Sequence, residues 1–299
     1  TIFKYTGSTW TPKNPSALVG ADVLSIHSAW TKYQDMWVGT AAHGMWRSAT
    51  SGESWVVACD GTTVGGAPFS VNTVRNCPLY VTDNEVWEGR SDGMRTSTDG
   101  GAGCADGQPS SDIKVIEFTP GYHGSAANYC EAFVGTSSAL FRLSCAGGQA
   151  GKTPPVIDAR ALAIAKEAKG LFVGSAARGL FKSVDNATMV EYNNFPNGKI
   201  PEIVAVCLHP DYYEGGDCGD QGTLFVAANF TGSPSDNGVY RSEDFGNTWV
   251  KLVAGEWPTA DVTMRDLAIS PAYADDSTLI AATSAHLFRW VSGYGWDRI

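Results

Sequence analysis

The chain has 299 residues, a formal net charge of −10 at pH 7 and a charged fraction of only 17%. The acidic balance, with no run of Lys or Arg, argues against a nucleic-acid partner and against an electrostatic membrane anchor, because both depend on clustered positive charge. No apolar stretch approaches the roughly 18 residues of a membrane-spanning helix, although a hydrophobic share of 43% supplies a substantial core.

The N-terminal segment IFKYTGSTWTP, within residues 1–13, predicts two short strands around a turn. It is similar to LFRWVSGYGW near the C-terminus, and both match the second half of a repeated unit. Residues 1–13 are therefore half a unit without its first two strands. Two interpretations stay open: an extra hairpin beside six complete units, or a longer natural chain with seven. The start at Thr1, without a methionine or signal peptide, is what a processed secreted protein shows, and a cytosolic chain whose start has been removed would show the same.

A two-strand pattern recurs six times along the chain. Each copy begins with a strand that ends in small residues, continues through a short turn, and ends with a strand that carries an aromatic or apolar residue beside Arg or Lys. The copies are WVGTAAHGMWRS (37–48), WEGRSDGMRTS (87–97), FVGTSSALFRLS (133–144), FVGSAARGLFKS (172–183), FVAANFTGSPSDNGVYRS (225–242) and IAATSAHLFRW (280–290). An apolar strand precedes most copies, and a fourth strand, often begun by a tryptophan, follows the pair.

Four strands repeated every 40 to 55 residues or so are typical of a propeller blade. A sandwich would not reuse one strand-pair pattern six times. We therefore predict an all-β fold, a β-propeller of four-stranded antiparallel blades, which forms one domain over residues 1–299. The expected blades are 21–60, 68–107, 111–150, 156–196, 201–254 and 261–299, with 1–13 as an extra hairpin or half blade.

The stretch SEDFGNTW resembles the Asp box, S/T-x-D-x-G-x-T-W, of the BNR (sialidase-type and Vps10-type) propeller repeats. The matching residues are Ser242, Asp244, Gly246, Thr248 and Trp249. Incomplete copies are STDGG, with Ser97, Asp99 and Gly101, and SVDNAT, with Ser183 and Asp185. A further copy, SATSGESW at 48–55, has no aspartate.

The residue types of this motif suit a turn. An aspartate in a hairpin loop accepts hydrogen bonds from backbone N–H groups that the turn leaves free. Gly246 supplies a positive φ at little steric cost, and Trp249 can pack its ring between sheets. The turn joins the third and fourth strands, at the outer edge of a blade. We therefore interpret these residues as structural, with no catalytic role.

The resemblance to sialidases implies an arginine triad, a Tyr/Glu nucleophile pair and an R-I-P-like signature, but the tripeptide is absent from this chain. The cationic residues recur instead in the third strand of different blades, which indicates a role in building the blade. They are Arg47, Arg142, Lys182, Arg241 and Arg289. A glycosidase that uses two carboxylates at the channel is the alternative function. Its candidates, all near first strands, are Asp22, Glu117, Asp158, Glu202 and Asp266.

None of the seven cysteines has the CxxC spacing of a zinc or redox site. The alternatives are disulfides and buried free thiols, and we favour disulfides in an oxidising compartment, with one cysteine unpaired. Cys130 and Cys145 flank a probable hairpin, and Cys207 and Cys218 bracket a short loop. Two of the remaining three, Cys59, Cys77 and Cys104, can pair, and the sequence does not say which.

We expect no cofactor. Carboxylates in GGDCGDQG (215–222) and SPSDNG (233–238) offer oxygens to Ca²⁺, but without EF-hand spacing. Aromatic residues in the expected loops either stack on a sugar or anchor a protein partner, or else cover the core. They are Trp30, Tyr122, Tyr212, Tyr213, Trp257 and Tyr273. The sequence thus predicts a secreted or cell-surface, non-enzymatic propeller that binds protein or glycan or assembles into an extracellular structure.

Overall fold

The structure is a computed structural model of the whole chain. It describes residues 2–5, 9–13, 18, 21–29, 34–59, 69–77, 84–119, 131–144, 149–153, 158–165, 170–183, 188–212, 222–257 and 262–299. Among these residues, no helix is long and apolar enough to cross a membrane.

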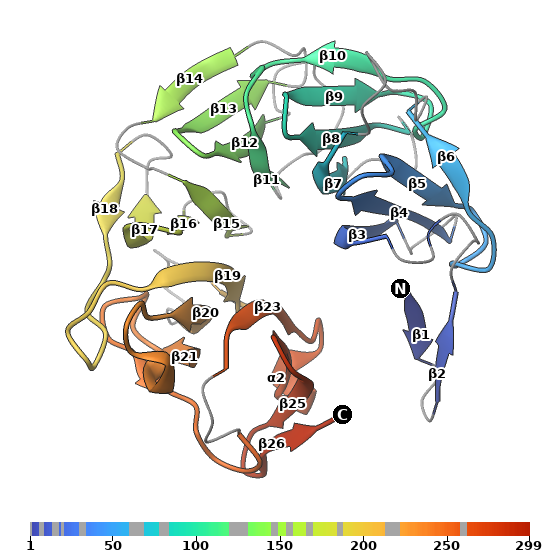
Figure 1. The fold of residues 1–299 in the computed structure, drawn as a ribbon. Coiled ribbons are helices and arrows are strands. Elements are labelled where there is room, and N and C mark those ends of the chain that lie inside the picture. The colour runs from blue at the N-terminus through green and yellow to red at the C-terminus, as the bar shows by residue number, and fades with distance from the viewer. Residues whose placement is uncertain are drawn as a thin grey trace. The chain divides into compact units, whose positions relative to one another are not determined.

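The described residues form one two-stranded hairpin and six four-stranded sheets (Figure 1). The hairpin is β1 (Phe3–Tyr5) and β2 (Trp10–Pro12). The first three sheets are β3 (Val23–Ala29), β4 (Asp35–Thr40), β5 (Met45–Ser48) and β6 (Val56–Ala58); β7 (Val71–Asn76), β8 (Val86–Arg90), β9 (Met94–Ser97) and β10 (Ala105–Gly107); and β11 (Ile113–Phe118), β12 (Glu131–Thr136), β13 (Leu140–Ser144) and β14 (Gln149–Thr153).

The other three sheets are β15 (Ala159–Ile164), β16 (Leu171–Ser175), β17 (Gly179–Ser183) and β18 (Val190–Glu191); β19 (Glu202–Leu208), β20 (Leu224–Asn229), β21 (Gly238–Ser242) and β22 (Val250–Lys251); and β23 (Met264–Ile269), β24 (Thr278–Thr283), β25 (Leu287–Val291) and β26 (Gly295–Arg298). A short 3-10 helix, η3 (Pro234–Asp236), precedes β21, and a single helical turn, α2 (Tyr273–Asp276), precedes β24.

Every four-stranded sheet is a meander, in which each strand pairs with the next one along the chain. The six sheets fall on the six stretches expected from the repeat, except that β14 ends at Thr153, beyond the expected end at 150. The hairpin expected in residues 1–13 is β1–β2.

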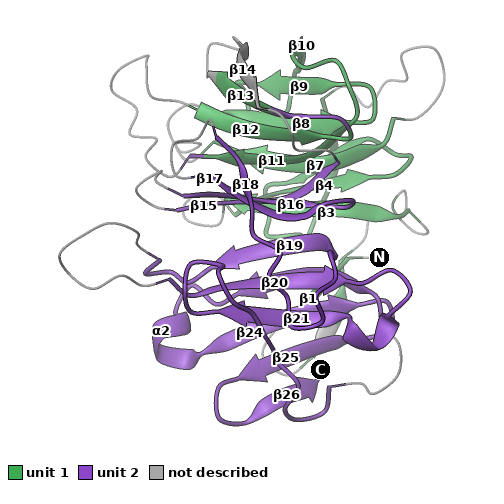
Figure 2. Ribbon diagram, turned by 90° about the vertical axis from the view of Figure 1, so that its left-hand side faces the viewer, with its two compact units in different colours: residues 1–118, 122–137, 141–151 green, residues 119–121, 138–140, 152–299 purple. Residues whose placement is uncertain are grey.

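The chain divides into two compact units (Figure 2). Unit 1 comprises residues 1–118, 122–137 and 141–151, and unit 2 comprises 119–121, 138–140 and 152–299. Unit 1 contains the β1–β2 hairpin, the β3–β6 and β7–β10 sheets, and most of the β11–β14 sheet. Unit 2 contains the β15–β18, β19–β22 and β23–β26 sheets.

A β-bulge marks the same place in the first strand of all six sheets. The pairing with the second strand shifts between Val23 and Ser25, Val71 and Thr73, Ile113 and Val115, Ala159 and Ala161, Ile203 and Ala205, and Met264 and Asp266. A bulge adds one residue and increases the local twist of a strand. Because it recurs, it gives a structural register in which residues of different sheets can be compared.

Neighbouring sheets within each unit pack through the second strands, and this packing explains why these strands combine an aromatic with a small residue. The aromatic side chains of Trp37, Trp87, Phe172 and Phe225 are almost completely buried. A Cβ at Gly39 would lie 2.5 Å from the Val71 carbonyl oxygen of the next sheet, and one at Gly174 would lie 2.6 Å from Ile203 Cγ2. The sheets therefore approach too closely for a side chain at these positions.

Candidate functional site

The turn between β21 and β22 is held by its own polar side chains. The Gly246 amide donates to Ser242 Oγ at 2.8 Å, and the Thr248 amide donates to Asp244 Oδ1 at 2.8 Å. The hydroxyls of Ser242 and Thr248 also donate to the Asp244 carboxylate, at 2.8 and 2.6 Å. Gly246 has a φ of +91°, which explains the glycine.

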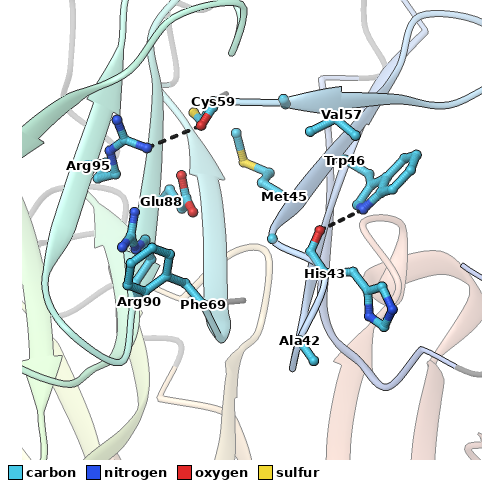
Figure 3. Close-up of a pocket in the computed structure, with 12 residues that line it drawn as sticks. Ala42, His43, Met45, Trp46, Val57, Cys59, Phe69, Glu88, Arg90 and Arg95 are labelled. Carbon is cyan, nitrogen blue, oxygen red and sulfur yellow. Dashed lines mark hydrogen bonds between the residues drawn. The ribbon is translucent and has the colours of Figure 1, made fainter. Parts of the chain in front are cut away.

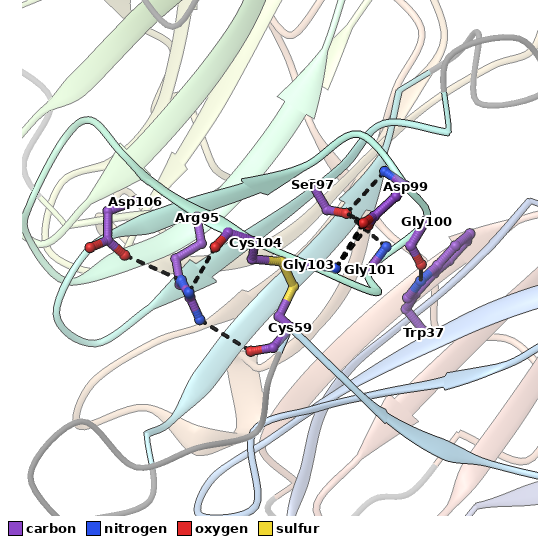
Figure 4. The surroundings of a disulfide bond; sticks show 10 residues. All are labelled: Trp37, Cys59, Arg95, Ser97, Asp99, Gly100, Gly101, Gly103, Cys104 and Asp106. Atoms are coloured by element: carbon purple, nitrogen blue, oxygen red, sulfur yellow. Dashed lines mark hydrogen bonds and ion pairs between the residues drawn. A yellow bond between two sulfur atoms is a disulfide. The ribbon is translucent and has the colours of Figure 1, made fainter.

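Two more turns repeat this design with different residues. In the turn after β9 (Figure 4), the amide of Gly101 donates to Ser97 Oγ at 2.8 Å, and that of Gly103 donates to Asp99 Oδ1 at 2.9 Å. In the turn after β5, the Ser54 amide donates to Thr50 Oγ1 at 2.8 Å, so a hydroxyl takes the place of the carboxylate. In the turn after β17, Ser183 is buried, while Asp185 lies outside the described residues. The hydrogen bonds of the Asp99 and Asp244 carboxylates all lie within their own turns.

The tryptophans near these turns join neighbouring elements. Trp37 Nε1 donates to the Gly100 carbonyl of the next sheet at 3.2 Å. Trp55 Nε1 donates to the carbonyls of Gly52 and Lys13, at 3.0 and 2.8 Å. Trp249 instead stacks on Phe195, with ring centroids 5.2 Å apart, and its buried Nε1 has no acceptor among the described residues.

Replacing Asp244 by alanine should lower the free energy of unfolding by about 2 kcal/mol, because hydrogen bonds to a charged group are lost from a half-buried turn. Asp244→Thr should retain most of the stability, as Thr50 does in its own turn. Its neighbour Glu243, which is exposed, serves as the control, and Glu243→Ala should change the value by less than about 0.5 kcal/mol. Urea unfolding followed by tryptophan fluorescence measures all three. Equal losses for the alanine and threonine variants would contradict this explanation of the turn.

The β7–β10 sheet carries charged residues where the other sheets carry apolar ones. The residue after the second-strand aromatic is fully buried in four other sheets, where it is Val38, Val134, Val173 or Val226, and so is Ala281, which follows Ile280 in the sixth sheet. Here it is Glu88, whose side chain is 3% exposed. Its cross-strand partner is Arg95, where the corresponding pairs are Val38 with Trp46 and Val173 with Phe181.

The Glu88 carboxyl lacks a hydrogen-bonding partner among the described residues, because the nearby arginines are engaged elsewhere. Its Oε2 is buried and accepts no hydrogen bond. Arg95 donates to the carbonyl oxygens of Cys59 and Cys104, at 3.1 and 2.9 Å. Arg90 forms a bidentate pair with Asp92, at 2.9 and 2.7 Å. Burial raises the pKa of Glu88 to about 7, although Arg90 and Arg95 act to lower it.

Glu88 lies at a cavity of about 270 Å³ between the β3–β6 and β7–β10 sheets (Figure 3). The lining residues are Ala42, His43, Gly44, Met45, Trp46, Val57, Ala58, Cys59, Phe69, Glu88, Arg90 and Arg95. The Arg90 guanidinium lies 3.6 Å from the centroid of the Phe69 ring. This volume is slightly below about 300 Å³, the lower end of the range for small-molecule sites. The cavity suits a few water molecules or a small polar group.

The wall of this cavity also contains a disulfide between Cys59 and Cys104, whose Cα atoms are 4.9 Å apart. One carboxylate oxygen of Glu88 and the two sulfurs lie within 4.8 Å of one another. Metal binding by cysteine requires thiolates, so the disulfide form does not offer these sulfurs as ligands.

Glu88 should make stability depend on pH. Its pKa is about 7 in the folded protein and 4.5 when unperturbed, so between these pH values the folded state binds more protons than the unfolded state. The free energy of unfolding therefore falls as the pH rises through this window, by about 3 kcal/mol in total. Glu88→Gln should remove this dependence, so that the variant matches the wild type at pH 5 and exceeds it at pH 8. Urea unfolding at both pH values tests this, and a parallel pH dependence in the variant would contradict it.

The other predicted disulfides are corrected where the structure describes them. Cys77 is buried and does not pair with Cys59, because Cys59 pairs with Cys104. Cys207 is a free thiol. Its Sγ lies 3.2 Å from the Leu267 carbonyl oxygen, and burial raises its pKa to about 12. Cys130, Cys145 and Cys218 lie outside the described residues.

The sequence left open whether the aromatic residues in the expected loops bind a partner or cover the core. Tyr212 and Tyr273 are 3% and 8% exposed, so these two cover the core and are not surface-binding residues. Tyr212 packs edge-on against Phe172, and Tyr273 packs against Phe225. Trp257 is half-buried and contacts Trp296, 4.7 Å between centroids. Trp30, Tyr122 and Tyr213 lie outside the described residues.

The recurring cations of the third strands contact their own sheets or neighbouring side chains. Their partners are Asp35 for Arg47, Glu131 for Arg142, Glu243 for Arg241 and Asp297 for Arg289. Lys182 lies over the rings of Phe172, Tyr192 and Phe245, about 5.3 to 5.5 Å from their centroids. These contacts fit a role in building the sheets.

Most of the candidate glycosidase carboxylates form ion pairs or hydrogen bonds with neighbouring groups of the protein. Glu117 pairs with Arg75 at 3.3 Å, and Asp158 pairs with Arg160 at 2.8 Å. Asp266 accepts from the Leu267 amide, Glu202 accepts from the Asn229 side chain, and Asp22 is exposed. In the SPSDNG segment, Asp236 accepts from Asn197 at 3.0 Å, while most of GGDCGDQG lies outside the described residues.

The sequence interpretation missed Glu88, although the repeat contains the signal. The copy WEGR has a glutamate where WVGT and FVGS have valine. A charge at a position that is buried elsewhere in the repeat marks a candidate functional position.

No protein-family profile matches the chain, and no curated protein matches it. Several solved structures are similar to it. An ancestral GH74 enzyme has a TM-score of 0.72 at 16% identity over 98% of this chain and 40% of its own. The extracellular domain of BT4673 from B. thetaiotaomicron has a TM-score of 0.66 at 14% identity, over 99% of this chain and 35% of its own. YCF48 from Cyanidioschyzon merolae has a TM-score of 0.64 at 13% identity, over 93% and 85%.

The chain is a β-propeller. Its four-stranded sheets are the blades, and β1–β2 is a two-stranded hairpin. At identities of 13 to 16% these likenesses establish the fold and carry no activity to this chain. The chain spans only 40% of the GH74 enzyme and 35% of BT4673.

Proposed function

We propose that this chain is a secreted or cell-surface propeller of the BNR/Asp-box type that binds another protein, or assembles with one, and has no catalytic role. The observation that carries the proposal is an exposed aliphatic face on the first strand of the first blade. Leu24 and Ile26 of β3 are 45% and 49% exposed. Adjacent exposed aliphatic residues on a regular element are typical of a contact surface.

The disposition of the charged groups supports a non-enzymatic role. The carboxylates of Asp99 and Asp244 serve their own turns, and those of Glu117 and Asp158 pair with arginines. A disulfide fits an oxidising compartment, and one structural neighbour is an extracellular domain. A GH74 enzyme is also a neighbour, but glycoside hydrolysis needs two carboxyl groups that face one sugar.

The experiment is a mass measurement on protein purified from its native source under mild conditions, from the medium and from the cells separately. We expect it in the medium or at the cell surface, in a complex heavier than the 31.7 kDa of one chain. Chemical crosslinking followed by mass spectrometry then identifies the partner. A free monomer confined to the cytosol, or hydrolysis of glucan oligosaccharides by the pure protein, would contradict the proposal.

A further inference from the structure

Three side chains of types that bind metal ions meet beside the cavity in unit 1. One carboxylate oxygen of Glu88 and the sulfurs of Cys59 and Cys104 all lie within 4.8 Å of one another. Glu88 and Cys59 line the cavity (Figure 3), and Cys104 is bonded to Cys59 (Figure 4). All three residues belong to unit 1, so the group lies within one compact unit.

Glu88 is the member of this group that needs a partner. Its side chain is 3% exposed, and its Oε2 accepts no hydrogen bond among the described residues. A carboxylate that is removed from water is stable when it is paired, hydrogen-bonded or coordinated to a metal ion. The sulfurs of a disulfide have no hydrogen to donate. The oxidised cysteines therefore give Glu88 no partner.

Reduction of the disulfide changes what the two sulfurs can bind. A dithiol reductant supplies two electrons and two protons to the S–S bond, which breaks to give two thiols, while the reductant itself becomes a disulfide. A divalent metal ion can then displace the two thiol protons and form two metal–sulfur bonds. Two thiolates and a carboxylate are ligands that Zn²⁺ accepts in proteins.

The distances within the group suit Zn²⁺. Its bonds to sulfur are about 2.3 Å long and those to carboxylate oxygen about 2.0 to 2.2 Å, so the ligand atoms of a tetrahedral site lie about 3.5 to 3.8 Å apart. The Glu88 oxygen and the sulfurs, at most 4.8 Å apart, are within about 1 Å of this spacing. The sulfurs separate once their bond is broken, and rotation about each Cα–Cβ bond lets them do so.

The backbone of both cysteines is held by contacts that do not involve the sulfurs. Arg95 donates to the carbonyls of Cys59 and Cys104, and the Cys59 amide donates to the Gly101 carbonyl at 2.7 Å. These contacts hold the cysteines in place after reduction. Zn²⁺ with two thiolates and one carboxylate carries a net charge of about −1, which the Arg95 guanidinium balances.

We propose that reduction of the Cys59–Cys104 disulfide opens a Zn²⁺ site, whose ligands are the two thiolates and the Glu88 carboxylate. The cavity of about 270 Å³ has room for a water molecule as the fourth ligand. The disulfide and the ion are thus alternative links between the β3–β6 and β7–β10 sheets. An oxidising compartment keeps the disulfide, and a reducing one allows the ion to bind.

The test uses Co²⁺ as a spectroscopic probe for Zn²⁺. The 299-residue protein is reduced with a phosphine, freed of reductant without oxygen, and titrated with Co²⁺. The reduced wild type should bind one more equivalent than the Cys59→Ser/Cys104→Ser variant, with a cobalt–thiolate charge-transfer band that Zn²⁺ abolishes by displacing the cobalt. The double variant keeps the remaining cysteines, so it measures their contribution.

Glu88→Gln tests the third ligand, because it keeps the size of the side chain and removes the charge. It should weaken binding of Zn²⁺ at least about tenfold in a competition titration. Asp106→Asn is the matched control. Asp106 is exposed and pairs with Arg95 beside the same cysteines, but it is not a member of the group. Its variant should bind Zn²⁺ as the wild type does, and circular dichroism confirms that both variants fold.

The oxidised wild type should show no more cobalt–thiolate absorption than the double variant. Equal metal binding by the reduced wild type and the double variant, or by the wild type and Glu88→Gln, would overturn the proposal. If reduction alone unfolds the chain, Zn²⁺ should refold the wild type and not the double variant. Failure of Zn²⁺ to refold it would then overturn the proposal as well.

Discussion

Replacing both Cys59 and Cys104 by serine should lower the free energy of unfolding by about 4 kcal/mol, since the disulfide closes a loop between residues far apart in the chain. The sequence separation is 45 residues, and the bond joins the end of the β3–β6 sheet to the β7–β10 sheet within unit 1. Arg95 donates to both cysteine carbonyls, so the backbone at the bond has support that does not depend on the sulfurs. The loss should therefore come mainly from the greater freedom of the unfolded chain.

Urea unfolding of the double variant and of the wild type, each with and without dithiothreitol, measures this loss. The reduced wild type should match the double variant, whose stability should not respond to the reductant. Cys207→Ala is the control, because Cys207 is a free thiol whose removal leaves the disulfide intact. A double variant as stable as the oxidised wild type would contradict a structural role for the bond.

The sequence predicted the blades because their packing restricts residue types at fixed positions. At Gly39 and Gly174 a Cβ would meet the next blade, so the repeat keeps small residues there. The turn at 48–55 was expected to be an incomplete copy, since it has no aspartate. It nevertheless forms, because the Thr50 hydroxyl accepts the hydrogen bond that Asp244 accepts in the complete copy.

The candidate site could not be predicted by the same reasoning, because it depends on departures from the repeat. A search for what the copies share passes over Glu88, which differs from Val38 and Val173 at the same position. The disulfide was undetermined for another reason. Cys59 follows the β3–β6 sheet, whereas Cys77 and Cys104 adjoin strands of the β7–β10 sheet, and the choice of partner depends on which strands of these neighbouring sheets meet.

The burial of Tyr212 and Tyr273 is another feature that the sequence alone does not predict. Both follow a first strand, where the sequence indicates a loop, and a tyrosine in a loop can point outwards or fold back on the core. The aromatic residues that bury them, Phe172 for Tyr212 and Phe225 for Tyr273, belong to a second strand. Tyr212 packs against the preceding blade, and such a contact cannot be read from the residues around the tyrosine.

Ile26→Asp should lower the free energy of unfolding by less than about 1 kcal/mol, whereas Val74→Asp should lower it by at least about 4 kcal/mol. The two residues hold the same position relative to the bulge in neighbouring blades, so the repeat alone predicts equal effects. Val74 is fully buried in an apolar cluster with Trp37 and Met45, where a carboxylate would be removed from solvent. Ile26 is half exposed, and an aspartate there would keep its hydration.

Urea unfolding of both variants at one pH measures the difference, and a Val74→Ala variant separates the loss of packing from the burial of a charge. Val74→Ala should fall between the two aspartate variants, because it removes two methyl groups and buries no charge. A loss for Ile26→Asp as large as that for Val74→Asp would mean that the β3 face is already covered in the free protein.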